Sequence, residues 1–127
     1  MLTKILVVDD EEDLKVLIKQ RFRQEIRQNE YDFIFAENGR QALEQLLEHT
    51  DVDLVLSDIN MPEMDGLTLL SKLNEQSSLL KSVMVSAYGD MENIRTAMNL
   101  GAFDFITKPI DFKDLDITIK KTIAHVN

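Results

Sequence analysis

The sequence predicts an α/β fold in which helices cover both faces of a parallel, five-stranded sheet. Apolar or aromatic segments of four to six residues recur along the chain, and they have the composition of strands. Each is followed by a longer stretch in which apolar residues recur at helical spacing. Strands that alternate with helices are joined by right-handed crossovers, so the strands run parallel and the helices pack on the two faces of the sheet.

Five segments are predicted as strands. Three are largely apolar, which is typical of strands buried on both faces, and the second and fifth in chain order are rich in aromatic residues. The predicted strands are residues 5–8, 31–36, 52–57, 83–86 and 103–107.

Five helices are predicted, one after each strand. The first begins near Asp13, and the acidic residues at its start complement the helix dipole. The other four cover residues 40–49, 67–74, 91–100 and 112–125. In the first two helices, the residues predicted to face the core are Leu14, Leu17, Ile18, Phe22 and Ile26, and then Ala42, Leu43, Leu46 and Leu47.

The length and composition of the chain exclude several classes of protein. Its 127 residues, 44% of them hydrophobic, match one globular domain, and the absence of cysteine excludes disulfides and thiolate metal sites. No apolar run approaches the roughly 20 residues that cross a bilayer, and no signal peptide is visible, so we expect a soluble, cytoplasmic protein without a membrane partner. The net charge of −9 argues against direct binding to nucleic acid.

A dense run of acidic residues follows the first predicted strand. Like charges repel one another, so five consecutive acidic residues need an explanation. Glu11, Glu12 and Asp13 fit the first turn of a helix, where acids are favourable. Asp9 and Asp10 lie on the strand end itself, and a helix cap explains at most one of them, so a cation site is the alternative interpretation.

Polar residues also end three of the other strands, namely Asp58, Ser86 and Lys108. In open parallel sheets, ligands bind beyond the carboxyl ends of the strands. If the first and third strands are neighbours, about 4.8 Å apart, Asp9, Asp10 and Asp58 come within reach of one ion. An all-oxygen ligand set favours Mg²⁺, with Mn²⁺ or Ca²⁺ as alternatives, over zinc.

The predicted cluster suits phosphoryl transfer. An aspartate can act as the nucleophile and form an aspartyl phosphate, while a lysine amine and a serine hydroxyl can hold the phosphoryl oxygens. Other phosphate chemistry fits poorly, because the four glycines are too scattered for a phosphate-binding loop. His49 and His125 fall on predicted helices away from the strand ends, so we expect both to be surface residues.

Four segments then give the chain a family resemblance. They are ILVVDDEED at 5–13, DLVLSDINMPEMDGLTLL at 53–70, VMVSAYGD at 83–90 and GAFDFITKPID at 101–111. With these motifs at these intervals, the chain resembles the receiver domain of response regulators in bacterial two-component signalling, and in particular the chemotaxis regulators. The resemblance covers essentially all of the chain, so residues 1–127 are expected to form a single receiver domain. It implies a flavodoxin-like (βα)5 doubly wound sheet with strand order 2-1-3-4-5.

The resemblance implies a role for each matching residue of the metal and acceptor site. Asp58 matches the phosphoacceptor, and Asp9 and Asp10 match the acidic pair that binds Mg²⁺ together with Asp58. The backbone carbonyl of Asn60 matches a further metal ligand. Lys108 resembles the lysine that contacts the acceptor and its phosphate.

The resemblance also implies a switch. Ser86 matches the hydroxyl residue that turns toward the phosphate, and Phe105 stands where the family places a switch aromatic, often Tyr. The missing hydroxyl of Phe105 removes one hydrogen bond from that switch. The Lys108–Pro109 peptide bond is expected to be cis.

The expected function is a signalling switch in a His-Asp phosphorelay. A histidine kinase or phosphotransfer protein donates a phosphoryl group to Asp58 in a Mg²⁺-dependent reaction. The surface formed by the helix 91–100, the strand 103–107 and the helix 112–125 then changes, and it controls an output domain or a downstream effector protein. A homodimer through the same face is also expected.

Other functions stay open at this stage. The chain is not expected to be an enzyme, although it assists its own phosphorylation and dephosphorylation. One alternative is a phosphate-independent, receiver-like interaction module, and another is a metal-dependent phosphohydrolase that uses an aspartate nucleophile. The sequence names neither the cognate kinase nor the output, and the chain fits a stand-alone regulator or a part of a longer protein equally well.

Overall fold

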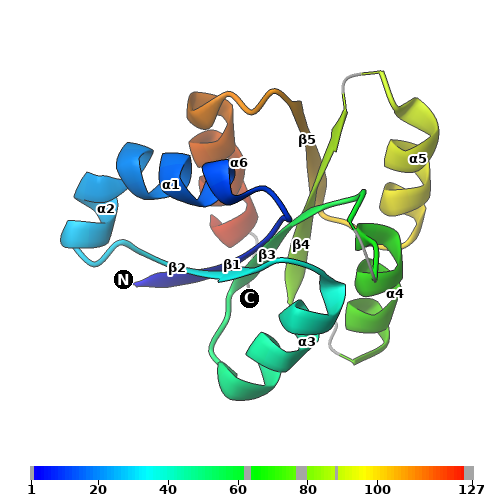
Figure 1. Cartoon of the computed structure of the whole chain (residues 1–127), viewed down its shortest axis with the longest axis horizontal. Helices are drawn as coiled ribbons and strands as arrows, with labels where there is room; N and C mark the ends of the chain where they lie inside the picture. The colour runs from blue at the N-terminus through cyan, green and yellow to red at the C-terminus, as the bar shows by residue number, and fades with distance from the viewer. Residues whose placement is uncertain (1, 62–63, 77–79, 88, 125–127) are drawn as a thin grey trace.

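The computed structural model describes residues 2–61, 64–76, 80–87 and 89–124. It contains the predicted parallel sheet, with the strands in the order β2-β1-β3-β4-β5 (Figure 1). The strands are β1 (Thr3–Val8), β2 (Tyr31–Ala36), β3 (Leu54–Asp58), β4 (Lys81–Ala87) and β5 (Asp104–Lys108). The predicted fold class and strand order are therefore confirmed.

Helices cover both faces of this sheet (Figure 1). They are α1 (Glu12–Arg21), α2 (Arg23–Arg27), α3 (Gly39–Glu48), α4 (Gly66–Gln76), α5 (Met91–Asn99) and α6 (Phe112–Ala124). Helices α1, α2 and α6 pack on one face, and α3, α4 and α5 pack on the other. None of the helices in the described ranges is long and apolar enough to cross a membrane.

The central strand β1 shows why an unbroken apolar run predicts a buried strand. Ile5 and Val7 point to the core under α1 and α6, while Leu6 and Val8 point to the core under α3 and α4. All four side chains are 0–2% exposed. A strand covered on both sides has no polar face, so it appears in the sequence as an unbroken apolar run.

The first predicted helix is in fact two helices. Helix α1 ends at Arg21 and α2 begins at Arg23, with Phe22 between them at φ −105° and ψ 19°. Phe22 is 3% exposed, and its ring packs against the rings of Tyr31 and Phe33 at centroid distances of 5.6 and 5.5 Å. We attribute the break to this aromatic packing, which periodicity in the sequence does not report.

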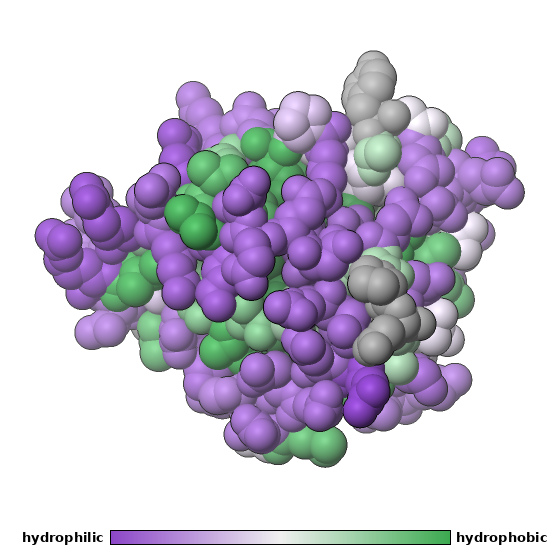
Figure 2. All heavy atoms as spheres, viewed as in Figure 1, coloured by the Kyte–Doolittle hydropathy of each residue, from purple (hydrophilic) through white to green (hydrophobic). Residues whose placement is uncertain are grey.

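Two residues predicted to face the core are exposed. Leu17 is 44% exposed and Leu47 is 83% exposed. Figure 2 shows a mostly hydrophilic face with a few hydrophobic patches, one of them over α1. Helical spacing sets which residues share a side of a helix but not how wide the covered stripe is, so the predicted stripes were too broad.

The two histidines were predicted to be surface residues. His49 is partly buried at the C-terminus of α3 rather than fully at the surface, and His125 lies outside the described residues.

A hydrogen bond joins the edge strand β2 to α6. The hydroxyl of Tyr31 donates to Oδ1 of Asp116 at 2.6 Å, and Oδ2 of Asp116 accepts from Nζ of Lys120 at 2.8 Å. Burial opposes ionisation of Asp116, but the hydrogen bonds from Lys120 and Tyr31 outweigh it and lower the pKa of the carboxyl group. Burial and the bond to Asp116 raise the pKa of Tyr31 above its ordinary value.

Replacing Tyr31 with Phe tests this bond. At about pH 7 the variant should be less stable by about 1 kcal/mol, the usual net value of such a hydrogen bond. Because the pKa of Tyr31 is raised in the folded state, its contribution is complete below about pH 10 and is lost as the pH rises further. Urea denaturation should therefore show a gap between the two midpoints near pH 7 that narrows above pH 10. Equal midpoints near pH 7 would contradict the assignment.

Candidate functional site

The register of the sheet brings the strand ends together at one edge. Val8 of β1 is paired with Ser57 of β3, so the residues that follow them, Asp9 and Asp58, lie side by side. On the other side of β3, Asp58 is paired with Val85 of β4, two residues before the end of that strand. Because all of these strands run parallel, their polar end residues face the same region of solvent.

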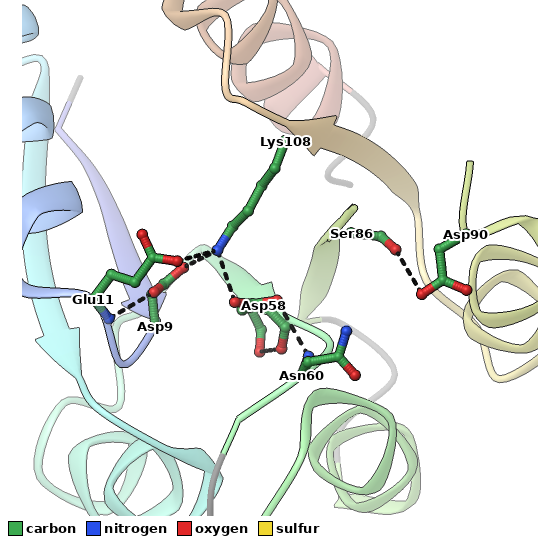
Figure 3. Close-up of polar contacts among 8 residues, drawn as sticks. Asp9, Glu11, Asp58, Asn60, Ser86, Asp90 and Lys108 are labelled. Carbon is green, nitrogen blue, oxygen red and sulfur yellow. Dashed lines mark hydrogen bonds and ion pairs between the residues drawn. The ribbon is translucent and has the colours of Figure 1, made fainter. Parts of the chain in front are cut away.

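Lys108 reaches this edge from the end of β5. Its Nζ lies 2.8 Å from Oδ2 of Asp58, 3.1 Å from Oε1 of Glu11 and 3.3 Å from Oδ2 of Asp9 (Figure 3). The side chains of Asp58 and Asp9 are 9% and 4% exposed, and that of Glu11 is 62% exposed. One ammonium group thus pairs with two buried carboxylates and one exposed carboxylate, and it offsets only part of their charge.

The charges around Lys108 keep it protonated. Burial opposes the charged amine, but the hydrogen bonds to Asp58 and Glu11 and the charges of Asp58 and Asp9 outweigh it and raise the pKa of Lys108 above its ordinary value. The peptide bond between Lys108 and Pro109 is cis, as the family resemblance implies.

The loop after β3 packs against Asp58. The backbone N–H of Asn60 donates to Oδ1 of Asp58 at 3.2 Å, and the N–H of Gly66 donates to the carbonyl of Ile59 at 2.7 Å. A Cβ atom on Gly66 would meet the carbonyl oxygen of Asp58 and lie 2.7 Å from Cα of Ile59. Only glycine fits this close approach, which brings the start of α4 against the backbone of Asp58.

Asp9 has one satisfied and one unsatisfied carboxylate oxygen. Its Oδ1 accepts a hydrogen bond from the backbone N–H of Glu11 at 2.8 Å. Its Oδ2 is buried and, among the described residues, has no hydrogen-bond partner, although Nζ of Lys108 is at ion-pair distance. Burial raises the pKa of Asp9, and the charge of Asp58 adds to this effect, while the Glu11 hydrogen bond and Lys108 act against it. The resting site therefore holds a costly buried oxygen.

The acidic residues fit a divalent cation. Asp9, Asp10 and Asp58 each offer a carboxylate oxygen, and these atoms lie within 4.8 Å of one another. Asp10 is exposed, so its oxygen is accessible to an ion from solvent. An ion at this point would supply the missing partner of the buried Asp9 oxygen, and oxygen-only ligands are those of Mg²⁺.

Within the described part of the chain, the side chains of Ser86 and Phe105 make no hydrogen bond to this cluster. Ser86 is fully buried, and its hydroxyl donates to Oδ2 of Asp90 at 3.5 Å, toward the start of α5 (Figure 3). The same Asp90 oxygen accepts from the side chain of Asn93 at 2.8 Å. Phe105 is 36% exposed on β5, in register with Met84 of β4. The structure thus brings together the side chains of Asp9, Asp10, Asp58 and Lys108, with the backbone of Asn60 beside Asp58, and it leaves Ser86 and Phe105 apart from them.

Sequence reasoning missed the roles of Glu11 and Asp90. Glu11 was interpreted as part of a helix start, yet its side chain makes no cap hydrogen bond and instead contacts Lys108. Asp90 ends the motif at 83–90 without a predicted role, and in the structure it accepts the hydrogen bond of the Ser86 hydroxyl. A signal for Glu11 was present, since it directly follows the acidic pair, whereas nothing in the sequence pairs Asp90 with Ser86.

Comparison with known proteins identifies the family. Residues 5–120 match the model of the response regulator receiver domain. The chain belongs to this family. The receiver domain is 37% identical to the chemotaxis protein CheY of Bacillus subtilis over 97% of this chain and 99% of that protein. It is 36% identical to the transcriptional regulatory protein ZraR of Escherichia coli, again over 97% of this chain, but it spans only 27% of the length of ZraR.

A solved structure supports the same assignment. The crystal structure of a response regulator receiver domain protein from Clostridium thermocellum superimposes with a TM-score of 0.86 and 28% sequence identity, covering 97% of this chain and 95% of that one. The receiver domain fold and its family are therefore shown by sequence and by structure.

Replacing Asp9 with Asn tests whether the acidic cluster is built for a cation. Without metal, the variant should be more stable by about 1 kcal/mol, because the amide removes a buried charge with an unsatisfied oxygen. With Mg²⁺, wild type should gain stability through binding and the variant should gain less. Denaturation in EDTA and in Mg²⁺ measures both effects.

Two further variants control for this experiment. Asp10→Asn should also weaken the Mg²⁺ effect, but it should not stabilise the metal-free protein, because Asp10 is exposed. Asp32→Asn, on the edge strand β2 with a side chain that is 47% exposed, should leave the Mg²⁺ effect unchanged. If Asp9→Asn gains as much from Mg²⁺ as wild type does, the acidic pair does not bind the ion.

Proposed function

We propose that this receiver domain is the phosphoacceptor switch of a His-Asp phosphorelay and that Asp58 is the acceptor. One observation carries the proposal: Nζ of Lys108 lies 2.8 Å from Oδ2 of Asp58, at a strand edge that also holds Asp9 and Asp10. A carboxylate held by an ammonium next to a cation site has what phosphoryl transfer needs, namely a nucleophile and positive charge around the transferred group.

The proposed reaction is a phosphoryl transfer to Asp58, and this geometry supports it. An oxygen of Asp58 attacks the phosphorus of a phosphohistidine on a histidine kinase or a phosphotransfer protein. The new O–P bond forms as the P–N bond breaks, and the imidazole leaves. Lys108 stays protonated and holds a phosphoryl oxygen. When bound by Asp9, Asp10, Asp58 and the backbone carbonyl of Asn60, Mg²⁺ supplies further positive charge to the transferred oxygens.

The signal is proposed to leave through α5, β5 and α6. The hydroxyl of Ser86 has to release Asp90 before it can reach a phosphate on Asp58, and Asp90 lies just before α5. The space that Ser86 leaves allows Phe105 to turn inward from its exposed position. This local change alters a surface that carries exposed apolar side chains, namely Met91, Met98, Phe105 and Ile117.

That surface is the proposed contact with an output domain, a downstream effector or a second copy of the chain. ZraR is named a transcriptional regulatory protein and is much longer than this chain, which is consistent with a receiver that controls a separate output. We propose that residues 1–127 act as one receiver domain in the cytoplasm, without direct contact to nucleic acid or membrane. A phosphate-independent interaction module is the alternative, and the shared contacts of Lys108 with Asp58 and Asp9 favour the switch over it.

Phosphorylation at Asp58 is tested by intact mass. With Mg²⁺ and a small phosphodonor such as acetyl phosphate, wild type should gain one phosphoryl group, because the proposed acceptor is the single carboxylate of Asp58, which lies 2.8 Å from Nζ of Lys108. Asp58→Asn should gain none, while Asp32→Asn, far from the site on β2, should label as wild type does. Absence of labelling in wild type would favour the interaction module, and continuous turnover of the donor would favour a hydrolase. Labelling that survives in Asp58→Asn would move the acceptor elsewhere.

Replacing Ser86 with Ala should separate phosphorylation from the response. Asp58 should still accept phosphate, but the conformational response of α5, β5 and α6 should be weaker. The expected loss of coupling free energy is about 1–3 kcal/mol, the usual value for coupling between two sites. Amide exchange on α5 and β5, with and without beryllium trifluoride as a phosphoryl mimic, measures the shift. Ser82→Ala is a matched control, because Ser82 is also buried on β4 but lies near the opposite end of the strand. Equal responses in wild type and Ser86→Ala would show that the hydroxyl carries no signal.

A further inference from the structure

Glu11 makes a contact that the proposed reaction does not use. Its Oε1 accepts a hydrogen bond from Nζ of Lys108 at 3.1 Å, next to the bond of 2.8 Å from the same nitrogen to Asp58 (Figure 3). Its backbone N–H separately donates to Oδ1 of Asp9. Glu11 therefore touches two parts of the site through two different groups, and only the contact to Lys108 involves the side chain.

The ammonium of Lys108 is shared among three carboxylates in the resting protein. It has three N–H donors, and three carboxylates lie within ion-pair distance, those of Asp58, Glu11 and Asp9. Its two hydrogen bonds go to Asp58 and Glu11, and a phosphoryl oxygen on Asp58 would compete with all three carboxylates for the same positive charge. A phosphoryl group that draws Lys108 toward itself therefore weakens one of these existing contacts.

Burial decides which contact gives way. The side chains of Asp58 and Asp9 are 9% and 4% exposed, so either carboxylate would lose its cation without gaining water. The side chain of Glu11 is 62% exposed, so its carboxylate can turn into solvent and be hydrated. Glu11 is the partner of Lys108 that leaves at the lowest cost.

We infer that Glu11 is a positioning residue that holds Lys108 in the resting state and competes with the phosphoryl group for it. The inference rests on the proposed function, since it needs Asp58 to be the acceptor. On phosphorylation, Lys108 moves one hydrogen bond from Oε1 of Glu11 to a phosphoryl oxygen. The backbone bond from Glu11 to Asp9, 2.8 Å long, stays in place, so the acidic pair keeps its geometry. The identity of residue 11 thus sets how readily this receiver accepts phosphate.

Three variants separate contact from charge. Glu11→Gln removes the charge and weakens the bond to Lys108, while Glu11→Asp keeps the charge but shortens the reach by one methylene. Glu12→Gln removes the same charge one residue further along. Glu12 is exposed in the first turn of α1, and it is not an ion-pair partner of Lys108 in the described part of the chain. All three retain the backbone N–H at residue 11.

The test is the rate of labelling by acetyl phosphate at fixed Mg²⁺, followed by intact mass. Glu11→Gln and Glu11→Asp should both label about two- to fivefold faster than wild type, the range expected for a partly exposed ion pair. Glu12→Gln should stay within about 1.5-fold of wild type at moderate salt. The NMR signals of the Lys108 side chain in the unphosphorylated protein should shift in both Glu11 variants and not in Glu12→Gln.

Each contrary result has a defined meaning. If wild type labels and the Glu11 variants label at the wild-type rate, or no faster than Glu12→Gln, the inference about Glu11 is overturned and the proposed function stands. If Glu11→Asp matches wild type while Glu11→Gln is faster, charge alone acts, and the role of the contact is overturned. If wild type itself does not label on Asp58, the proposed function fails and this inference fails with it.

Discussion

The ion pair between Lys108 and two buried carboxylates is the interaction on which the site depends. Parallel pairing of β1 with β3 places Asp9 and Asp58 next to each other whether or not their charges are neutralised. Two like charges 4 Å apart repel by about 4 kcal/mol at an effective dielectric constant of 20. Nζ of Lys108, 2.8 Å from one carboxylate and 3.3 Å from the other, offsets much of this repulsion. The compensation is incomplete, because one oxygen of Asp9 still lacks a hydrogen bond. The proposed binding of a cation and of a phosphoryl group rests on this incomplete compensation.

The fold fixes the positions of the Asp9 and Asp58 carboxylates. The strands that carry Asp9 and Asp58 are buried on both faces, so neither backbone can shift outward without exposing apolar side chains. Gly66 allows the start of α4 to pack against the backbone of Asp58. The less tightly bound groups near the site are the exposed side chain of Glu11 and the hydroxyl of Ser86, whose hydrogen bond to Asp90 is 3.5 Å long. The proposed switch rests on this combination of a fixed acidic centre and less tightly bound neighbours.

The sequence predicted the sheet and its polar edge because both follow from short-range rules. A strand buried on both faces must be apolar throughout, and the residue after it must be polar if it meets solvent, so Asp9, Asp10 and Asp58 could be placed without a structure. The break between α1 and α2 could not be predicted, because it depends on Phe22 packing with rings from β2.

The contacts of individual side chains were also beyond the sequence. Glu11 and Lys108 are 97 residues apart in the chain, and both of their usual roles, helix start and strand end, were plausible without the ion pair. The direction of the Ser86 hydroxyl depends on Asp90 and on the start of α5. Residue types and strand ends therefore predict which groups gather at the edge, whereas pairing among them is decided by packing between distant segments.

The most direct measurement is a crystal structure of the protein grown with Mg²⁺ and beryllium trifluoride. We predict beryllium bonded to a carboxylate oxygen of Asp58, a cation held by Asp9, Asp10 and Asp58, and Nζ of Lys108 bonded to a fluorine atom. A structure in which the fluoride complex is absent from Asp58, or in which the cation lies away from these three carboxylates, would contradict the assignment of this edge as the phosphoacceptor site.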